Sequence, residues 1–194
     1  TAWLNMPPPP RAITAMLRSA AGAADVAYVE QRYGDAFNAI NAACYWVCMG
    51  RHAKRSSEAR AWIDESEGAS ALLSAQAMTL RVLPQMEVQA LANTAHGAAS
   101  AGACRRRASS STHYSEEYGE EYVSLLERYG ESYGENESSS SAQYSSSGSK
   151  PTHERSNGYR PLWEGLQVAA SRRLADANTT DLMQLAWGFA VGQS

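Results

Sequence analysis

Apolar side chains recur every three or four residues along most of this chain, which is the spacing of one helix face. Ile13, Met16 and Leu17 show this spacing in the first such segment. No segment has the alternation of apolar and polar residues that predicts a strand, so the sequence predicts an all-α protein. The predicted helices cover residues 11–24, 34–50, 69–83, 86–102, 160–176 and 178–191.

Residues near the ends of these segments predict where some of the helices begin. Asp35 is the expected N-cap of 34–50, and Asn178 or Thr179 is the expected N-cap of the last helix. Pro84 is expected in the first turn of the helix that follows it, where a missing amide hydrogen costs little. The polar segment 51–68 is a connector or a short surface helix.

Two parts of the chain resemble one another when the sequence is shifted by 91 positions. Residues 72–99 then align with 163–190, and Gly97 matches Gly188. A weaker third copy is expected upstream, with Asn41 in the place of Asn93. Each copy reads as a helical hairpin, and the three hairpins are expected at 11–49, 69–103 and 161–193.

The second helix of each later copy is rich in Ala and Gly where a core helix usually carries Leu or Ile. A glycine within a helix costs about 1 kcal/mol relative to alanine. We therefore expect Ala95, Gly97 and Ala99 to form a seam where two helix backbones approach closely. The predicted fold is an α-solenoid of stacked helical hairpins with an inserted low-complexity segment.

The insertion is marked by an abrupt change in composition. Residues 108–150 carry eight Glu against Arg128 and Lys150, so the rest of the chain has a net charge of +3. The predicted division is an extended lead-in, hairpin repeats, a Ser/Tyr/Glu-rich insertion and a last hairpin. These parts cover residues 1–10, 11–104, 105–160 and 161–194.

The second helices also resemble a known family. Leu182, Gln184, Ala186, Trp187 and Ala190 follow the pattern that ends the degenerate repeats of octotricopeptide-type proteins, which are often associated with a RAP domain. In the preceding copy Leu91, Asn93, Ala95 and Ala99 follow the same pattern, with His96 in the tryptophan position. The resemblance implies an architecture like that of pentatricopeptide proteins and RNA binding in mitochondria or plastids.

Clusters of basic residues near helix ends are the candidate sites for RNA phosphates, because the arginine guanidinium binds phosphate with a planar fork. Solvated helix ends are the competing interpretation. Trp46, Trp163 and Trp187 are expected in the core. The candidate residues are Arg51, Lys54, Arg55, Arg105, Arg106, Arg107, Arg172 and Arg173.

Little in the sequence indicates catalysis or a cofactor. Cys44, Cys48 and His52 have zinc-ligand chemistry, but a fourth ligand is missing and buried thiols are the simpler reading. The nucleotide-binding, hydrolase and metalloprotease motifs are absent. No apolar run is long enough to span a bilayer, so no membrane insertion is expected.

Pattern and resemblance together predict a non-catalytic RNA-binding protein without a cofactor. The expected setting is a mitochondrial ribosome, where the chain would hold rRNA beside neighbouring proteins. Two alternatives stay open: a protein-only structural subunit of a respiratory or ATP-synthase complex, and a free organellar RNA-maturation factor.

Overall fold

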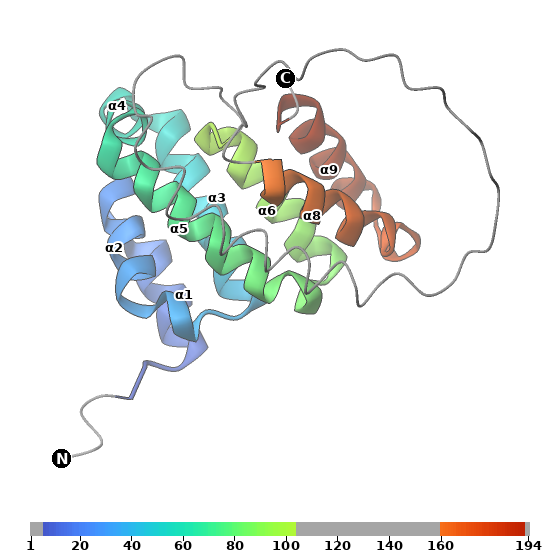
Figure 1. Cartoon of the computed structure of the whole chain (residues 1–194), viewed down its shortest axis with the longest axis horizontal. Coiled ribbons are helices and arrows are strands. Elements are labelled where there is room, and N and C mark those ends of the chain that lie inside the picture. The colour runs from blue at the N-terminus through green and yellow to red at the C-terminus, as the bar shows by residue number, and fades with distance from the viewer. Residues whose placement is uncertain (1–5, 104–159, 193–194) are drawn as a thin grey trace, which may run out of the picture. The chain divides into compact units, whose positions relative to one another are not determined.

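A computed structural model describes residues 6–103 and 160–192 of the chain, and within these ranges it contains helices and no strand. The predicted all-α class is therefore confirmed. The α-helices are α1 (Pro10–Ser19), α2 (Ala23–Tyr33), α3 (Ala39–Arg55), α4 (Ser57–Asp64), α5 (Ser66–Val82), α6 (Val88–Ala101), α8 (Arg160–Ser171) and α9 (Thr179–Gly192) (Figure 1). The same ranges also contain three short 3-10 helices: η2 (Gly34–Ala36), η3 (Leu83–Gln85) and η4 (Leu174–Asp176).

One local arrangement occurs three times, in α2–η2–α3, α5–η3–α6 and α8–η4–α9. In each, a helix runs into a 3-10 turn, one extended residue follows, and the next residue is the N-cap of the second helix. The extended residues are Phe37, Met86 and Ala177. Both η3 and α6 recur 91 residues later as η4 and α9, which is the offset found in the sequence. We call these three units the first, second and third helix pair.

The first pair differs from the prediction. The expected helix 11–24 is interrupted at Ala20–Gly22, and a separate helix, α2, forms the partner of α3. Helix α2, whose buried side chains include Val26 and Val29, was not predicted. Small residues on both sides of Gly22 hid the break, because alanine is compatible with a continuous helix.

The helices form two layers. Helices α3, α6 and α9 lie side by side in that order, with α1 against the free side of α3 (Figure 1). We call these four helices the α3 layer. Helices α2, α5 and α8 form the α5 layer, in which α5 also rests on α3 and α8 also rests on α6. Trp46, Leu72, Leu91 and Leu166 are among the fully buried side chains of the core.

The glycines explain why the α3 layer is rich in small residues. Gly97 lies against the backbone of Trp46 and Val47, and Gly188 lies against Ala95 in the same way one pair later. Gly97 and Gly188 are each the tenth residue after the N-cap of their helix. The close approach of α6 to α3 and that of α9 to α6 therefore occur at the same helix position. The expected close approach is therefore present, but Gly97 makes it with α3 and Ala95 with α9, so these residues belong to two helix contacts and not to one seam.

The register of the first pair corrects one alignment made from the sequence. The N-caps Asn38 and Glu87 are 49 residues apart, so Asn41 corresponds to Ala90 and not to Asn93. Asn41 has a different role. Its side-chain amide donates to the carbonyl oxygen of Pro10 at 2.9 Å and to Thr14 Oγ1 at 2.8 Å, and so it joins α1 to α3.

The N-caps also differ in part from the prediction. Asn38, not Asp35, caps α3, and its side chain accepts from the amide of Asn41 at 2.9 Å. Asn178 caps α9, as predicted, and exchanges hydrogen bonds with Asp181. Pro84 lies in η3 and not in the first turn of α6. None of the described helices combines the length and apolarity needed to cross a membrane.

Candidate functional site

The predicted phosphate-binding residues do not come together in one patch. Arg51, Lys54 and Arg55 lie in the last two turns of α3. Arg172 and Arg173 lie just before η4, at the turn that joins α8 to α9, so they belong to the opposite end of a helix pair. The remaining three candidates, Arg105, Arg106 and Arg107, are outside the described residues.

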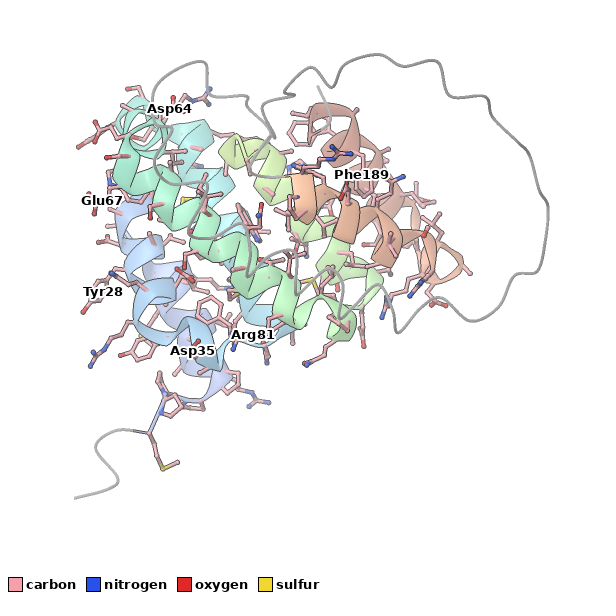
Figure 2. All side chains as sticks on the ribbon, viewed as in Figure 1. Tyr28, Asp35, Asp64, Glu67, Arg81 and Phe189 are labelled. Atoms are coloured by element: carbon pink, nitrogen blue, oxygen red, sulfur yellow. The ribbon has the colours of Figure 1, made fainter. Side chains whose placement is uncertain are left out.

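Arg173 takes part in a contact between helix pairs. Its guanidinium donates to the carbonyl oxygen of Pro84 in η3 at 3.0 Å and to that of Ala169 at 3.3 Å. Arg81 does the same one pair earlier, where it donates to Gly34 and, at 2.9 Å, to Asp35 in η2. Figure 2 shows Arg81 next to Asp35. These arginines join each turn to the preceding one, a structural role that the sequence analysis did not identify.

The more promising surface is the side of the α3 layer that faces away from the α5 layer, which we call the open face. Its side chains on α3 follow one another at helical spacing and are exposed or half-buried. They are Ile40, Cys44, Val47, Arg51, Lys54 and Arg55. Three of the predicted cations therefore lie on this face.

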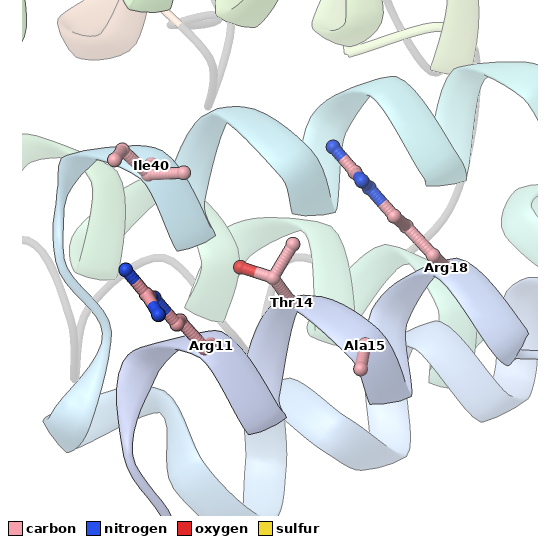
Figure 3. A pocket seen from close by; sticks show the side chains of 5 residues that line it. All are labelled: Arg11, Thr14, Ala15, Arg18 and Ile40. Carbon is pink, nitrogen blue, oxygen red and sulfur yellow. The ribbon is translucent and has the colours of Figure 1, made fainter.

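Helix α1 adds two arginines that were not among the candidates. Arg11 and Arg18 are exposed and line a shallow groove of about 410 Å³ between α1 and α3, together with Thr14, Ala15 and Ile40 (Figure 3). A signal for them was present in the sequence, because residues 1–24 contain two arginines seven positions apart and no acidic residue.

Charge is strongly segregated between the two layers. The four helices of the α3 layer contain one acidic residue, Asp181. Its side chain is 3% exposed and exchanges hydrogen bonds with Asn178, the N-cap of α9. The other described acids lie on α2, α4, α5 and α8, in the 3-10 helices η2 and η4, and at the N-caps of α5 and α6, which are Glu65 and Glu87. Figure 2 shows two of them, Asp64 and Glu67. The part of the open face that α1 and α3 form thus carries five cations, and these two helices contain no carboxylate. A surface with this excess of positive charge attracts anions.

Three side chains from three helices meet on the open face. Lys54 Nζ lies 3.3 Å from His96 Nε2 and 4.8 Å from the centre of the Trp187 ring. The rings of His96 and Trp187 are 4.5 Å apart and tilted by 38°. Burial, and then the charge of Lys54, lowers the pKa of His96, so the imidazole is neutral at physiological pH.

The expectation that Trp187 belongs to the core is wrong, although it holds for Trp46 and Trp163. Trp187 is 39% exposed because α9 is the last described helix of its layer, so no further helix covers that side of the ring. His96 occupies the same position in α6, where α9 covers it. The burial of a side chain at this repeat position therefore depends on whether another helix follows in the layer.

Cys44 and Cys48 are free thiols whose Sγ atoms lie 4.0 Å apart. A hydrogen bond from Cys48, and then Arg18 and Arg51, lower the pKa of the Cys44 thiol to about 6, although partial burial opposes this. The Cys44 thiolate and burial raise the pKa of Cys48. Among the described residues no group of three His, Cys, Asp or Glu side chains is placed to hold a metal ion.

The outer side of α9 is apolar and exposed. Helix α6 has a side that packs against α9. The residues on the outer side of α9 come 91 positions after the residues on that side of α6, so the two helix sides are equivalent in the repeat. On α6, this surface is Leu91, Ala92, Ala95 and Ala99; on α9, it is Leu182, Met183, Ala186 and Ala190. Leu182 is 43% exposed and Met183 69%, whereas Leu91 is fully buried.

Comparisons of the chain with protein-family models, with curated proteins and with solved structures give no match.

Proposed function

We propose that this protein is a non-catalytic α-solenoid that binds the sugar-phosphate backbone of RNA on its open face. The observation that carries the proposal is the segregation of charge. Helices α1 and α3 contribute five cations and contain no acid, and the described carboxylates all lie outside these two helices. A surface of this kind supplies the sequence-independent part of RNA affinity, because each neutralised phosphate releases a counterion.

The exposed cations are suited to phosphate contact. Arg11, Arg18 and Lys54 are exposed, so a phosphate can reach them without unfolding. Arg51 is half-buried on the same face, one helical turn before Lys54. Trp187 adds an aromatic surface beside Lys54, and aromatic rings stack with unpaired bases. Single-stranded RNA is therefore the form of nucleic acid that the open face fits best.

The solenoid arrangement is part of the same proposal. The recurring turn, the equivalent glycines and the paired roles of Arg81 and Arg173 all support units that are related by translation along the α3 layer. Units that contact only their neighbours form solenoids, which use one face for extended ligands. The resemblance of the second helices to octotricopeptide-type repeats agrees with this role, and on it rests our proposal of a mitochondrial ribosome as the setting and rRNA as the ligand.

Cross-linking of the native assembly tests the proposal. We expect ultraviolet irradiation to attach RNA to peptides from 10–19 and 39–55, which carry the open-face cations. Peptides from α4 and α5, which carry Asp64 and Glu67, serve as the internal control and should carry none. Cross-links to protein alone, or RNA attached mainly to the acidic helices, would refute RNA binding on this face.

One observation favours a second candidate, a structural subunit that contacts protein. The outer side of α9 repeats the α6 surface that a neighbouring helix covers, and exposed apolar patches mark interaction sites. A helical hairpin with a glycine or alanine in its second helix is the partner that this surface fits, because Gly188 makes that contact on α6.

The two candidates give different results in the same experiment. A Met183→Glu variant should lose protein cross-links from α9 and keep the RNA cross-links from α3. If this variant releases the chain from its assembly and no RNA is attached to α3, the structural-subunit function replaces RNA binding.

A further inference from the structure

Cys44 and Cys48 form a pair in which solvent reaches one sulfur much more readily than the other. Cys44 is half-buried on the open face, and Cys48, one turn further along α3, is 1% exposed. Their Sγ atoms are 4.0 Å apart, so each is the nearest thiol to the other among the described residues. A reagent from solvent therefore meets Cys44 first.

The surroundings of this pair favour a thiolate at Cys44. Arg18 approaches from α1 and Arg51 from α3, and Arg51 Nη2 is 3.7 Å from Cys48 Sγ. Neither helix contains an acid that would offset the two guanidinium charges. Because the thiolate is the nucleophilic form of cysteine, a partly exposed thiol beside arginines is the arrangement found at reactive cysteines.

The same charges disfavour the main alternative, a metal site. Two guanidinium groups beside the sulfurs repel a divalent cation. A third protein ligand is also absent among the described residues. An electrophile that carries no positive charge, such as a peroxide, meets neither obstacle.

We propose that Cys44 is an oxidation site for hydroperoxides and that Cys48 converts the product to a disulfide within α3. In the first step Cys44 Sγ attacks the hydroperoxide: an S–O bond forms, the O–O bond breaks, and the departing alkoxide takes a proton to become an alcohol, or water from hydrogen peroxide. Cys44 is oxidised by two electrons to a sulfenic acid, and the peroxide is reduced.

In the second step Cys48 Sγ attacks Cys44 Sγ. An S–S bond forms, the S–O bond breaks, and hydroxide leaves with the proton of the Cys48 thiol as water. The first step prepares the second, because the Cys44 thiolate is the main cause of the raised pKa of Cys48 and it no longer exists in the sulfenic acid. The sulfurs must close from 4.0 Å to a bond of about 2.05 Å. Because Cβ atoms four residues apart on a helix are about 5–6 Å apart and a disulfide needs about 3.8 Å, the turn of α3 between the two cysteines must unwind, and this strain makes the disulfide easy to reduce.

The proposal does not depend on RNA binding. It concerns the chemistry of the thiols, and its test uses no nucleic acid. If the open face binds another anion or none, the oxidation of Cys44 is unaffected.

The test uses the full chain with Cys104→Ser, which removes the third cysteine. After treatment with hydrogen peroxide at neutral pH, we expect mass spectrometry to show the loss of two hydrogen atoms from the protein. The peptide map should contain a disulfide between residues 44 and 48, and dithiothreitol should reverse it. In a Cys48→Ala variant, the sulfenic acid should persist on Cys44 and be captured by a cyclic dione. A Cys44→Ser variant should leave Cys48 unmodified at the same dose.

An additional variant separates activation by charge from simple exposure. Arg18→Gln should slow the oxidation of Cys44 at pH 6.5 by about three- to tenfold, since less thiolate is present. Arg32→Gln, which removes an exposed charge from α2, should leave the rate unchanged. Oxidation of Cys44 no faster than that of a free cysteine derivative, or no capture of a sulfenic acid in the Cys48→Ala variant, would overturn the proposal.

Discussion

Gly97 of α6 lies against the carbonyl group of Trp46 in α3, so that a Cβ atom on Gly97 would stand 2.5 Å from the Trp46 oxygen. Backbone atoms cannot yield as a flexible side chain can. The contact therefore holds the two helices at a separation that only glycine permits. Gly188 has the same relation to Ala95, where a Cβ atom would stand 2.9 Å from the carbonyl carbon.

Gly97→Ala should destabilise the protein in spite of the better helix propensity of alanine. Overpacking a close contact costs about 1–3 kcal/mol or more, while the propensity gain is about 1 kcal/mol. We expect a net loss of about 2 kcal/mol in the free energy of unfolding, measured by urea denaturation, and a smaller loss for Gly188→Ala. Gly22→Ala, with nothing within 4 Å of the new Cβ, is the control. Equal stability of Gly97→Ala and wild type would contradict the role of this contact.

Asn41→Ala should weaken the attachment of α1. The side chain is fully buried and donates to Pro10 and Thr14 across the helix contact. Its loss leaves Thr14 Oγ1 without that donor, at a cost of about 2–3 kcal/mol. Thermal unfolding should show this loss, whereas Asn93→Ala, a half-buried position without such bonds in the described structure, should change stability by about 0.5 kcal/mol or less. Similar effects of the two substitutions would contradict this account of Asn41.

The sequence revealed the second and third helix pairs but misread the first. Gly97 and Gly188 match because both face a neighbouring backbone, and this constraint is visible as identical residues. In the first pair Cys48 stands where the later pairs have glycine, because the neighbour there is α1 and not a repeat of the same helix. Without this glycine the alignment was made through Asn41, and it was wrong by three residues. Regular spacing alone could not correct this error.

The open face was only partly predictable for a related reason. Lys54 and its neighbours stand out in the sequence as a basic cluster, so Arg51, Lys54 and Arg55 were found. Arg11 and Arg18 stand out in the sequence only as two arginines in a segment without acids. Their place on this face follows from the packing of α1 on α3, a tertiary contact that the sequence did not show. The exposure of Trp187 likewise follows from the position of α9 at the edge of the described layer.

His96 should make the stability depend on pH below neutrality. Its pKa is lowered in the folded protein by burial and by Lys54, so in the window below about 6.5 the unfolded chain binds more protons than the folded one. The free energy of unfolding should therefore fall as pH decreases from 7.5 to 5.5. Since other groups titrate as well, the quantity to compare is the difference between wild type and His96→Gln. A difference that stays constant over this window would contradict the lowered pKa.

The central claim is that the cations of the open face bind RNA phosphates. The most direct test is the salt dependence of binding to a labelled single-stranded RNA, measured by fluorescence anisotropy. Arg18→Gln/Lys54→Gln should reduce the slope of log affinity against log salt by about 1.4, because each lost contact to a single strand removes about 0.7. Arg32→Gln/Arg160→Gln removes the same charge from α2 and α8 and should leave the slope unchanged. An equal effect of the two double variants, or no salt-dependent binding by the wild type, would contradict the claim.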